Sequence, residues 1–122
     1  KNKNMILQTN LKHIVTDKDH DEAINDNENV MVCCGRMGPM CTPVYAAMKE
    51  LEGEYPNVEF KDMLFDNPYA AVIRDLPEAR GFMGLPFVVY YKNGKVVRAT
   101  SGIQSKEQIK GILDSQFTNG SE

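Results

Sequence analysis

The chain has 122 residues and a net charge of −3, values that exclude several classes of partner. A small negative charge gives no electrostatic attraction to nucleic acid or to an anionic membrane surface, so we expect neither partner. No run of apolar residues approaches the length needed to cross a bilayer. The length predicts a single domain over residues 1–122, with its core at about 12–117 and a polar tail from 118.

Three cysteines, Cys33, Cys34 and Cys41, limit the redox chemistry. An odd number excludes a complete set of intrachain disulfides, so at most one bridge forms and one thiol is left over. That count suits a reducing compartment or a redox-active site better than a secreted domain held by disulfides. Together with the missing apolar signal region, it predicts a cytoplasmic location. No His and Cys spacing resembles a zinc site, so neither a metal nor a cofactor is expected.

The first half of the chain predicts two strands that alternate with two helices. Apolar residues within 5–16 predict a first strand, and the acidic run from Asp17 suits the first turn of a short helix. Val30–Cys34 is a continuous apolar run, which is typical of a central strand buried on both faces. Apolar positions at helical spacing predict a second helix over 39–53, with proline in its first turn.

The second half predicts a third strand, a further helix and a hairpin. Residues 58–65 alternate as a strand, and a helix begins at Asn67 and Pro68 and is interrupted or ended by Pro77. Two apolar runs, at 87–91 and 95–99, are joined by Asn93-Gly94, the strongest short signal for a β-hairpin.

Ser105 and Gln108 form the capping-box pattern of a last helix. A strand–helix–strand unit followed by an antiparallel hairpin and a helix predicts an α/β domain with a mixed sheet.

This order and three local sequences resemble the thioredoxin family. Residues 84–95 (Gly-Leu-Pro-Phe and the hairpin after it) look like the cis-proline loop of that family, and residues 101–109 look like its last turn and C-terminal helix. Residues 30–41 are similar, without a gap, to its central strand and active-site loop. The resemblance covers about 12–117 and implies the thioredoxin fold, a central mixed sheet flanked by helices on both faces.

The chain departs from that family at the residues that carry its chemistry. Cys41 occupies the position of the second cysteine of the Cys-x-x-Cys pair, while Gly38 stands where the first, nucleophilic cysteine is found. Met37 and Cys34 stand in place of tryptophans, and Val32 in place of a buried aspartate that assists proton transfer. The chemistry implied by the resemblance therefore cannot be transferred whole.

Each cysteine has a reactive and a structural interpretation. Cys41 lies within the first helical turn if the helix is capped by Gly38, where unpaired N–H groups favour a thiolate; the alternative is a small buried helix residue. Cys34 is a candidate displaced partner for Cys41, and the alternative is core packing. Cys33 alternates with Cys34 along the strand, so we expect it to face the opposite side and to lie in the core.

The resemblance also implies a substrate-binding loop beside Cys41. A cis bond before Pro86 would present the backbone of Leu85 to a substrate strand. Substrate-binding positions implied in this way are Gly38, Pro39, Met40, Leu85 and Pro86.

Several methionines could form an apolar rim around Cys41. Met37, Met40 and Met83 are candidates for a docking groove, since methionine-rich surfaces adapt to varied partners. Met63 is expected to be an ordinary core residue.

Two carboxylates and two histidines complete the candidates. Asp62 lies in the predicted third strand and Asp66 at its end, and either could assist proton transfer, although a solvated carboxylate at a strand end is the more common role. His13 and His20 lie in the polar N-terminal part and are expected at the surface.

Three functional hypotheses follow. The first is an atypical thiol–disulfide oxidoreductase acting on protein or small-molecule disulfides through Cys41, with Cys34 as displaced partner and a thioredoxin reductase or glutathione as redox partner. The second is a redox-inactive thioredoxin-fold module that binds partners in the groove around Cys41 and Pro86. The third, an iron–sulfur cluster shared at a dimer interface, is disfavoured because monothiol glutaredoxins keep the first cysteine of the motif and this chain keeps the second.

Overall fold

A five-stranded mixed sheet forms the centre of the computed structural model, which describes residues 5–117. The predicted polar tail from 118 lies outside the described residues. The strand order is β1-β3-β2-β4-β5, with β1, β2 and β3 parallel, β4 antiparallel to β2, and β5 antiparallel to β4. The strands are β1 (Lys12–Ile14), β2 (Asn29–Gly35), β3 (Glu59–Leu64), β4 (Phe87–Lys92) and β5 (Lys95–Ser101).

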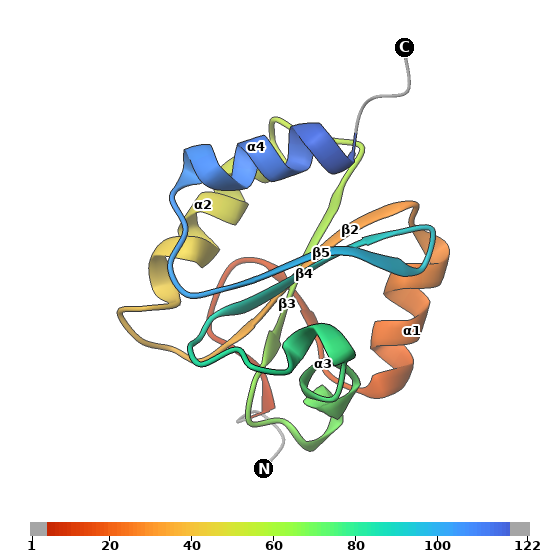
Figure 1. Ribbon diagram of the computed structural model, residues 1–122, viewed down its shortest axis with the longest axis vertical. Coiled ribbons are helices and arrows are strands. Elements are labelled where there is room, and N and C mark those ends of the chain that lie inside the picture. The colour runs from red at the N-terminus through yellow and green to blue at the C-terminus, as the bar shows by residue number, and fades with distance from the viewer. Residues whose placement is uncertain (1–4, 118–122) are drawn as a thin grey trace.

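Helices cover both faces of this sheet. In Figure 1, α2 and α4 lie on one side of it and α1 and α3 on the other. The predicted α/β architecture, with helices on both faces, is confirmed. The helices are α1 (Asp17–Asp26), α2 (Thr42–Glu52), α3 (Ala71–Arg74) and α4 (Lys106–Gln116), with short 3-10 turns at Pro68–Ala70 and Pro77–Ala79.

The sequence predicted the elements better than their lengths. The first strand has only three residues, because most of the predicted segment 5–16 runs outside the sheet. α2 begins at Thr42, since Gly38 to Cys41 form a turn in which the Gly38 carbonyl accepts the N–H groups of Cys41 and Thr42. The helix predicted after Asn67 is broken into short pieces, because Pro77 has no N–H to continue it.

Two apolar layers hold the helices against the sheet, and β2 contributes to both. Met31 and Cys33 pack with α2 and α4, whereas Val30, Val32 and Cys34 pack with α1 and α3. This division follows from the period of two along a strand, which sends successive side chains to opposite faces. Every residue of β2 is buried, as its uninterrupted apolar run predicted.

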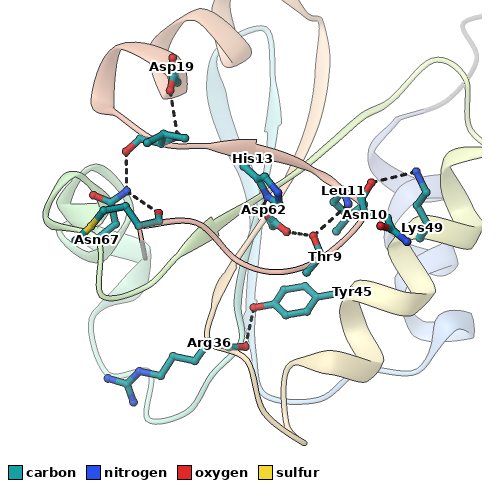
Figure 2. Close-up of polar contacts among 12 residues, drawn as sticks. Thr9, Asn10, Leu11, His13, Asp19, Arg36, Tyr45, Lys49, Asp62 and Asn67 are labelled. Atoms are coloured by element: carbon teal, nitrogen blue, oxygen red, sulfur yellow. Dashed lines mark hydrogen bonds and ion pairs between the residues drawn. The ribbon is translucent and has the colours of Figure 1, made fainter. Parts of the chain in front are cut away.

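A buried carboxylate joins β1 to β3. Asp62, on β3, has no exposed surface and accepts a hydrogen bond from the Thr9 hydroxyl. Its other oxygen lies 2.6 Å from Nδ1 of His13, on β1 (Figure 2). Placing His13 at the surface was therefore wrong in part: its ring is mostly buried, because it supplies the partner that a buried carboxylate requires.

The surface prediction for His20 was wrong as well. His20 lies in α1, is buried, and its Nε2 lies 2.8 Å from the hydroxyl oxygen of Tyr91 on β4. The contact satisfies both polar groups inside the α1 face of the sheet.

Asn67 fastens the N-terminal segment to the turn after β3. Its buried amide donates hydrogen bonds to the carbonyls of Met5 and Val15 (Figure 2). Its Oδ1 accepts the N–H of Tyr69. Three segments that are distant in sequence thus meet at one side chain.

Replacing Asn67 with alanine should lower the free energy of unfolding by about 3 kcal/mol, because two partly buried carbonyls and one N–H lose a hydrogen-bond partner. Chemical denaturation followed by circular dichroism measures this change. Asn25→Ala is the control, since Asn25 is exposed on α1 and alanine favours a helix. Equal stability of the two variants would contradict the role assigned to Asn67.

The Asp62 carboxyl should also make stability depend on pH. Burial raises its pKa above the ordinary value, although the hydrogen bonds from His13 and Thr9 lower it in part. Between the unfolded and folded pKa values the folded state holds more protons, so the free energy of unfolding should fall as pH rises through this interval.

Denaturation at several pH values between about 4 and 5.5 tests this sign. Asp62→Asn should remove this contribution to the slope. A wild-type stability that rises with pH more steeply than that of Asp62→Asn would contradict a raised pKa for Asp62.

Candidate functional site

A groove of about 450 Å³ lies beside Cys41, between the 36–41 turn and the loop that precedes β4. The predicted substrate-binding residues Gly38, Pro39, Met40 and Leu85 line it together with Cys41. Pro86 is not among the lining residues, and the Leu85–Pro86 peptide bond is cis. The structure thus brings four of the five predicted binding residues to one groove.

Cys41 stands at the start of α2 as its N-cap residue, one position outside the helical turn in which it was predicted. Its side chain is 3% exposed. The sulfur accepts the backbone N–H of Arg36 at 3.5 Å. The Tyr45 hydroxyl borders the same space beside Gly35 as this sulfur, and its single hydrogen is donated to the Arg36 carbonyl at 3.0 Å (Figure 2). The Arg36 N–H is therefore the donor to the thiol that lines the groove, and Tyr45 holds the carbonyl of the same residue.

Gly35 leaves the space in which these groups meet. A Cβ atom at this position would lie 2.6 Å from the Tyr45 hydroxyl oxygen and 2.8 Å from the Cys41 sulfur. Both distances are too short for any side chain, so the end of β2 must carry glycine for Cys41 and Tyr45 to pack there.

Cys34 lies on the other face of the sheet. Its side chain packs in the layer of α1 and α3, whereas Cys41 packs in the layer of α2 and α4. The structure does not bring together the two thiols that the sequence suggested as a displaced pair. Burial raises the pKa of Cys34 to about 12, with a partial opposing effect from Arg74.

Cys33 shares the layer of Cys41 and is fully buried, as predicted for a core residue. Burial raises the pKa of its thiol well above the ordinary value, and the neighbouring Cys41, Cys34 and Asp62 add to this. Because the thiolate is the nucleophile, Cys33 and Cys34 are poorly suited to start an exchange reaction at neutral pH. All three cysteines are free.

The two predicted carboxylates are already engaged elsewhere. Both oxygens of Asp62 contact Thr9 and His13 in the interior, so Asp62 is not the solvated residue expected at a strand end. Asp66 is exposed and accepts two hydrogen bonds from the Arg36 guanidinium, at 2.8 and 2.9 Å, which lower its pKa.

The methionines fall into two groups, one in the core and one at the rim of the groove. Met63 is fully buried in the core, as predicted. Met37, Met40 and Met83 line the groove with exposures of 48%, 52% and 95%. The rim of the groove is therefore apolar and open to solvent.

Tyr45 is the site residue that sequence reasoning missed. It lies four positions after Cys41, a spacing that places two residues on the same face at the start of a helix. That spacing was available from the sequence, but the approach of Gly35 and the Arg36 carbonyl depends on how β2 and α2 pack.

Within residues 5–117, no group of three or more His, Cys, Asp or Glu side chains is arranged to hold a metal ion. Over the same residues, none of the helices combines the length and apolar character of a membrane span.

Comparisons with known proteins identify the fold. No protein-family profile matches the chain, and no curated protein matches it. Among solved structures, thioredoxin from Plasmodium falciparum is 21% identical with a TM-score of 0.69, over 87% of this chain and 99% of that protein. Oxidised thioredoxin O2 from Arabidopsis thaliana is 11% identical with a TM-score of 0.72, over 93% and 99%.

A mutant thioredoxin from Halobacterium salinarum is 18% identical, with a TM-score of 0.70 over 85% of this chain and 88% of that protein. These likenesses extend over nearly the whole domain and agree with the strand order and helix placement described above. The chain therefore has the thioredoxin fold.

Proposed function

We propose that this protein exchanges thiols and disulfides through Cys41, by a mechanism that uses one of its own thiols and an external second thiol. The observation that carries the proposal is the position of Cys41: it is the cysteine that lines the groove, and its sulfur accepts the backbone N–H of Arg36. Donors of this kind stabilise a thiolate, the form that attacks a disulfide.

The proposed reaction has two steps. The Cys41 thiolate attacks one sulfur of a bound disulfide, a new S–S bond forms to Cys41, and the other sulfur leaves as a thiolate. An external thiolate, such as that of glutathione, then attacks the mixed disulfide and releases Cys41. Substrate disulfides on proteins or small molecules would lie in the groove against the exposed methionines.

The external thiol replaces an internal resolving cysteine. Cys34 faces the opposite layer and Cys33 is fully buried, so neither reaches the groove in this conformation. A role for Cys34 as displaced partner, with a thioredoxin reductase closing the cycle, requires the end of β2 to rearrange. Asp62 and Asp66 are candidates for proton transfer only if they leave their present partners, whereas the Tyr45 hydroxyl is already beside the sulfur.

Intact-mass analysis after incubation with glutathione disulfide tests the proposal. The wild type should gain one glutathione, mapped to Cys41, and should lose it again in excess reduced glutathione. Cys41→Ser should gain none, and Cys34→Ser should react like the wild type because its thiol packs on the other face. Formation of an internal Cys34–Cys41 bond would instead support the displaced pair.

Absence of any adduct on the folded protein would favour a second function, a binding module without redox chemistry. The observation in its favour is the burial of Cys41 in a groove whose rim is formed by exposed methionines. Such a module would bind apolar segments of partner proteins.

Tyr45→Phe should slow the alkylation of Cys41 by iodoacetamide at neutral pH by about fivefold, because the Arg36 carbonyl loses its donor and the Arg36 N–H is then held less firmly against the Cys41 sulfur. Peptide mapping of samples quenched at successive times gives the rate for Cys41 alone. Tyr69→Phe is the matched control, since Tyr69 is half exposed and lies in the 68–70 turn. Equal rates in both variants would contradict this role of the Tyr45 hydroxyl.

A further inference from the structure

A second cavity, of about 340 Å³, lies on the face of the sheet opposite Cys41. Its floor is formed by side chains buried in the layer of α1 and α3: Cys34 on β2, Ile73 on α3 and Phe87 on β4. Phe65 and Phe82 form further parts of its lining. A cavity of this size with apolar walls is typical of a site for a small organic molecule.

Two guanidinium groups line the same cavity, and they differ in how their charge is compensated. Arg36 forms a two-pronged ion pair with Asp66, so its charge is already neutralised. Arg74 donates from Nη1 to the carbonyls of Phe65 and Asn67, which carry no net charge. Among residues 5–117, no carboxylate lies within 4.0 Å of Arg74.

The hydrogen bonds of Arg74 leave one edge of its guanidinium available. Nη1 uses both of its hydrogens, and Nη2 makes one long contact of 3.5 Å with the Pro68 carbonyl. Within the described chain, Nε and the second Nη2 hydrogen have no acceptor. Two adjacent N–H groups in one plane match the two oxygens of a carboxylate.

The aromatic walls indicate a flat ligand. The Arg36 and Arg74 guanidinium carbons lie 5.3 and 5.6 Å from the ring centroid of Phe65. Phe82 meets Phe87 edge to face, with ring centroids 4.8 Å apart. Since two guanidinium groups already lie over the Phe65 ring, a ligand ring would pack against the apolar side chains of Cys34, Ile73 and Phe87, where a fully polar anion would gain no apolar contact.

We propose that this cavity binds a small aromatic carboxylate, with its ring among Cys34, Ile73 and Phe87 and its carboxylate on Arg74. Cys41 does not line this cavity and Cys34 does not line the groove, although the two hollows share Arg36 and the 83–85 loop. It does not depend on any cysteine being reactive.

Titration of the ¹⁵N-labelled protein with 1-naphthoate, followed by amide chemical shifts, tests the proposal. Saturable shifts should centre on Cys34, Phe65 and Ile73. The neutral analogue 1-naphthalenemethanol, which keeps the rings, should bind roughly tenfold more weakly because it cannot form the charged pair with Arg74.

Arg74→Met should also weaken naphthoate binding by about tenfold. Arg98→Met is the matched control: it removes the same charge from an exposed position on β5 and should leave the affinity within about twofold. Ala79→Leu fills the cavity without changing charge and should abolish binding; it supplies the variant test if Arg74→Met fails to fold. The comparison of the two ligands on the wild type needs no variant.

Several results would overturn the proposal: no saturable shifts with naphthoate, equal affinity for the neutral analogue, or shifts centred on Met40 and Cys41. An equal loss of naphthoate affinity in Arg98→Met and Arg74→Met would show that net charge alone causes the effect, and this result would also overturn the proposal. The glutathione adduct on Cys41 is measured separately, so failure of either proposal leaves the other to be judged by its own result.

Discussion

The alternation of side chains along β2 is the constraint on which the rest of the structure depends. β2 is the central strand, and its residues divide strictly between the two apolar layers. Adjacent cysteines are therefore carried to opposite sides of the sheet, Cys33 toward α2 and Cys34 toward α1. Exchanging their sides would require a one-residue slip of the strand, which would turn every buried side chain of β2 to the wrong layer. The packing of the core thus determines which thiol shares a layer with Cys41.

Buried polar side chains position the chain segments that the two apolar layers do not hold, chiefly β1 and the segment before it. The short edge strand β1 is held to β3 by the contact between His13 and Asp62, and the segment before it is held by Asn67. A buried polar group is costly without a partner, so each contact specifies one arrangement of chain segments that apolar packing alone would not select. These contacts hold β1 and the segments on either side of it against β3 and the turn that follows β3.

The sequence predicted the fold through features that are local in the chain. The apolar run of β2, the Asn93-Gly94 hairpin and the capping box at Ser105 each depend on a few neighbouring residues, and each was found where it was predicted. The histidines and Tyr45 were misjudged or missed because their partners are distant in sequence. His20 contacts a residue 71 positions away, a pairing that no local pattern contains. The groove was predicted from the resemblance. The contacts of Arg36 with Cys41 and Tyr45 were not, because they depend on how β2 and α2 pack.

The loop before β4 separates two hollows that lie on opposite faces of the sheet. Met83, Gly84 and Leu85 line both the groove beside Cys41 and the cavity above Cys34, and Arg36 lines both as well. Because the two hollows share these four residues, a substitution at any of them changes the lining of both at once. A variant made there to alter one site also alters the other, whereas Ile73 and Pro39 each belong to one lining only.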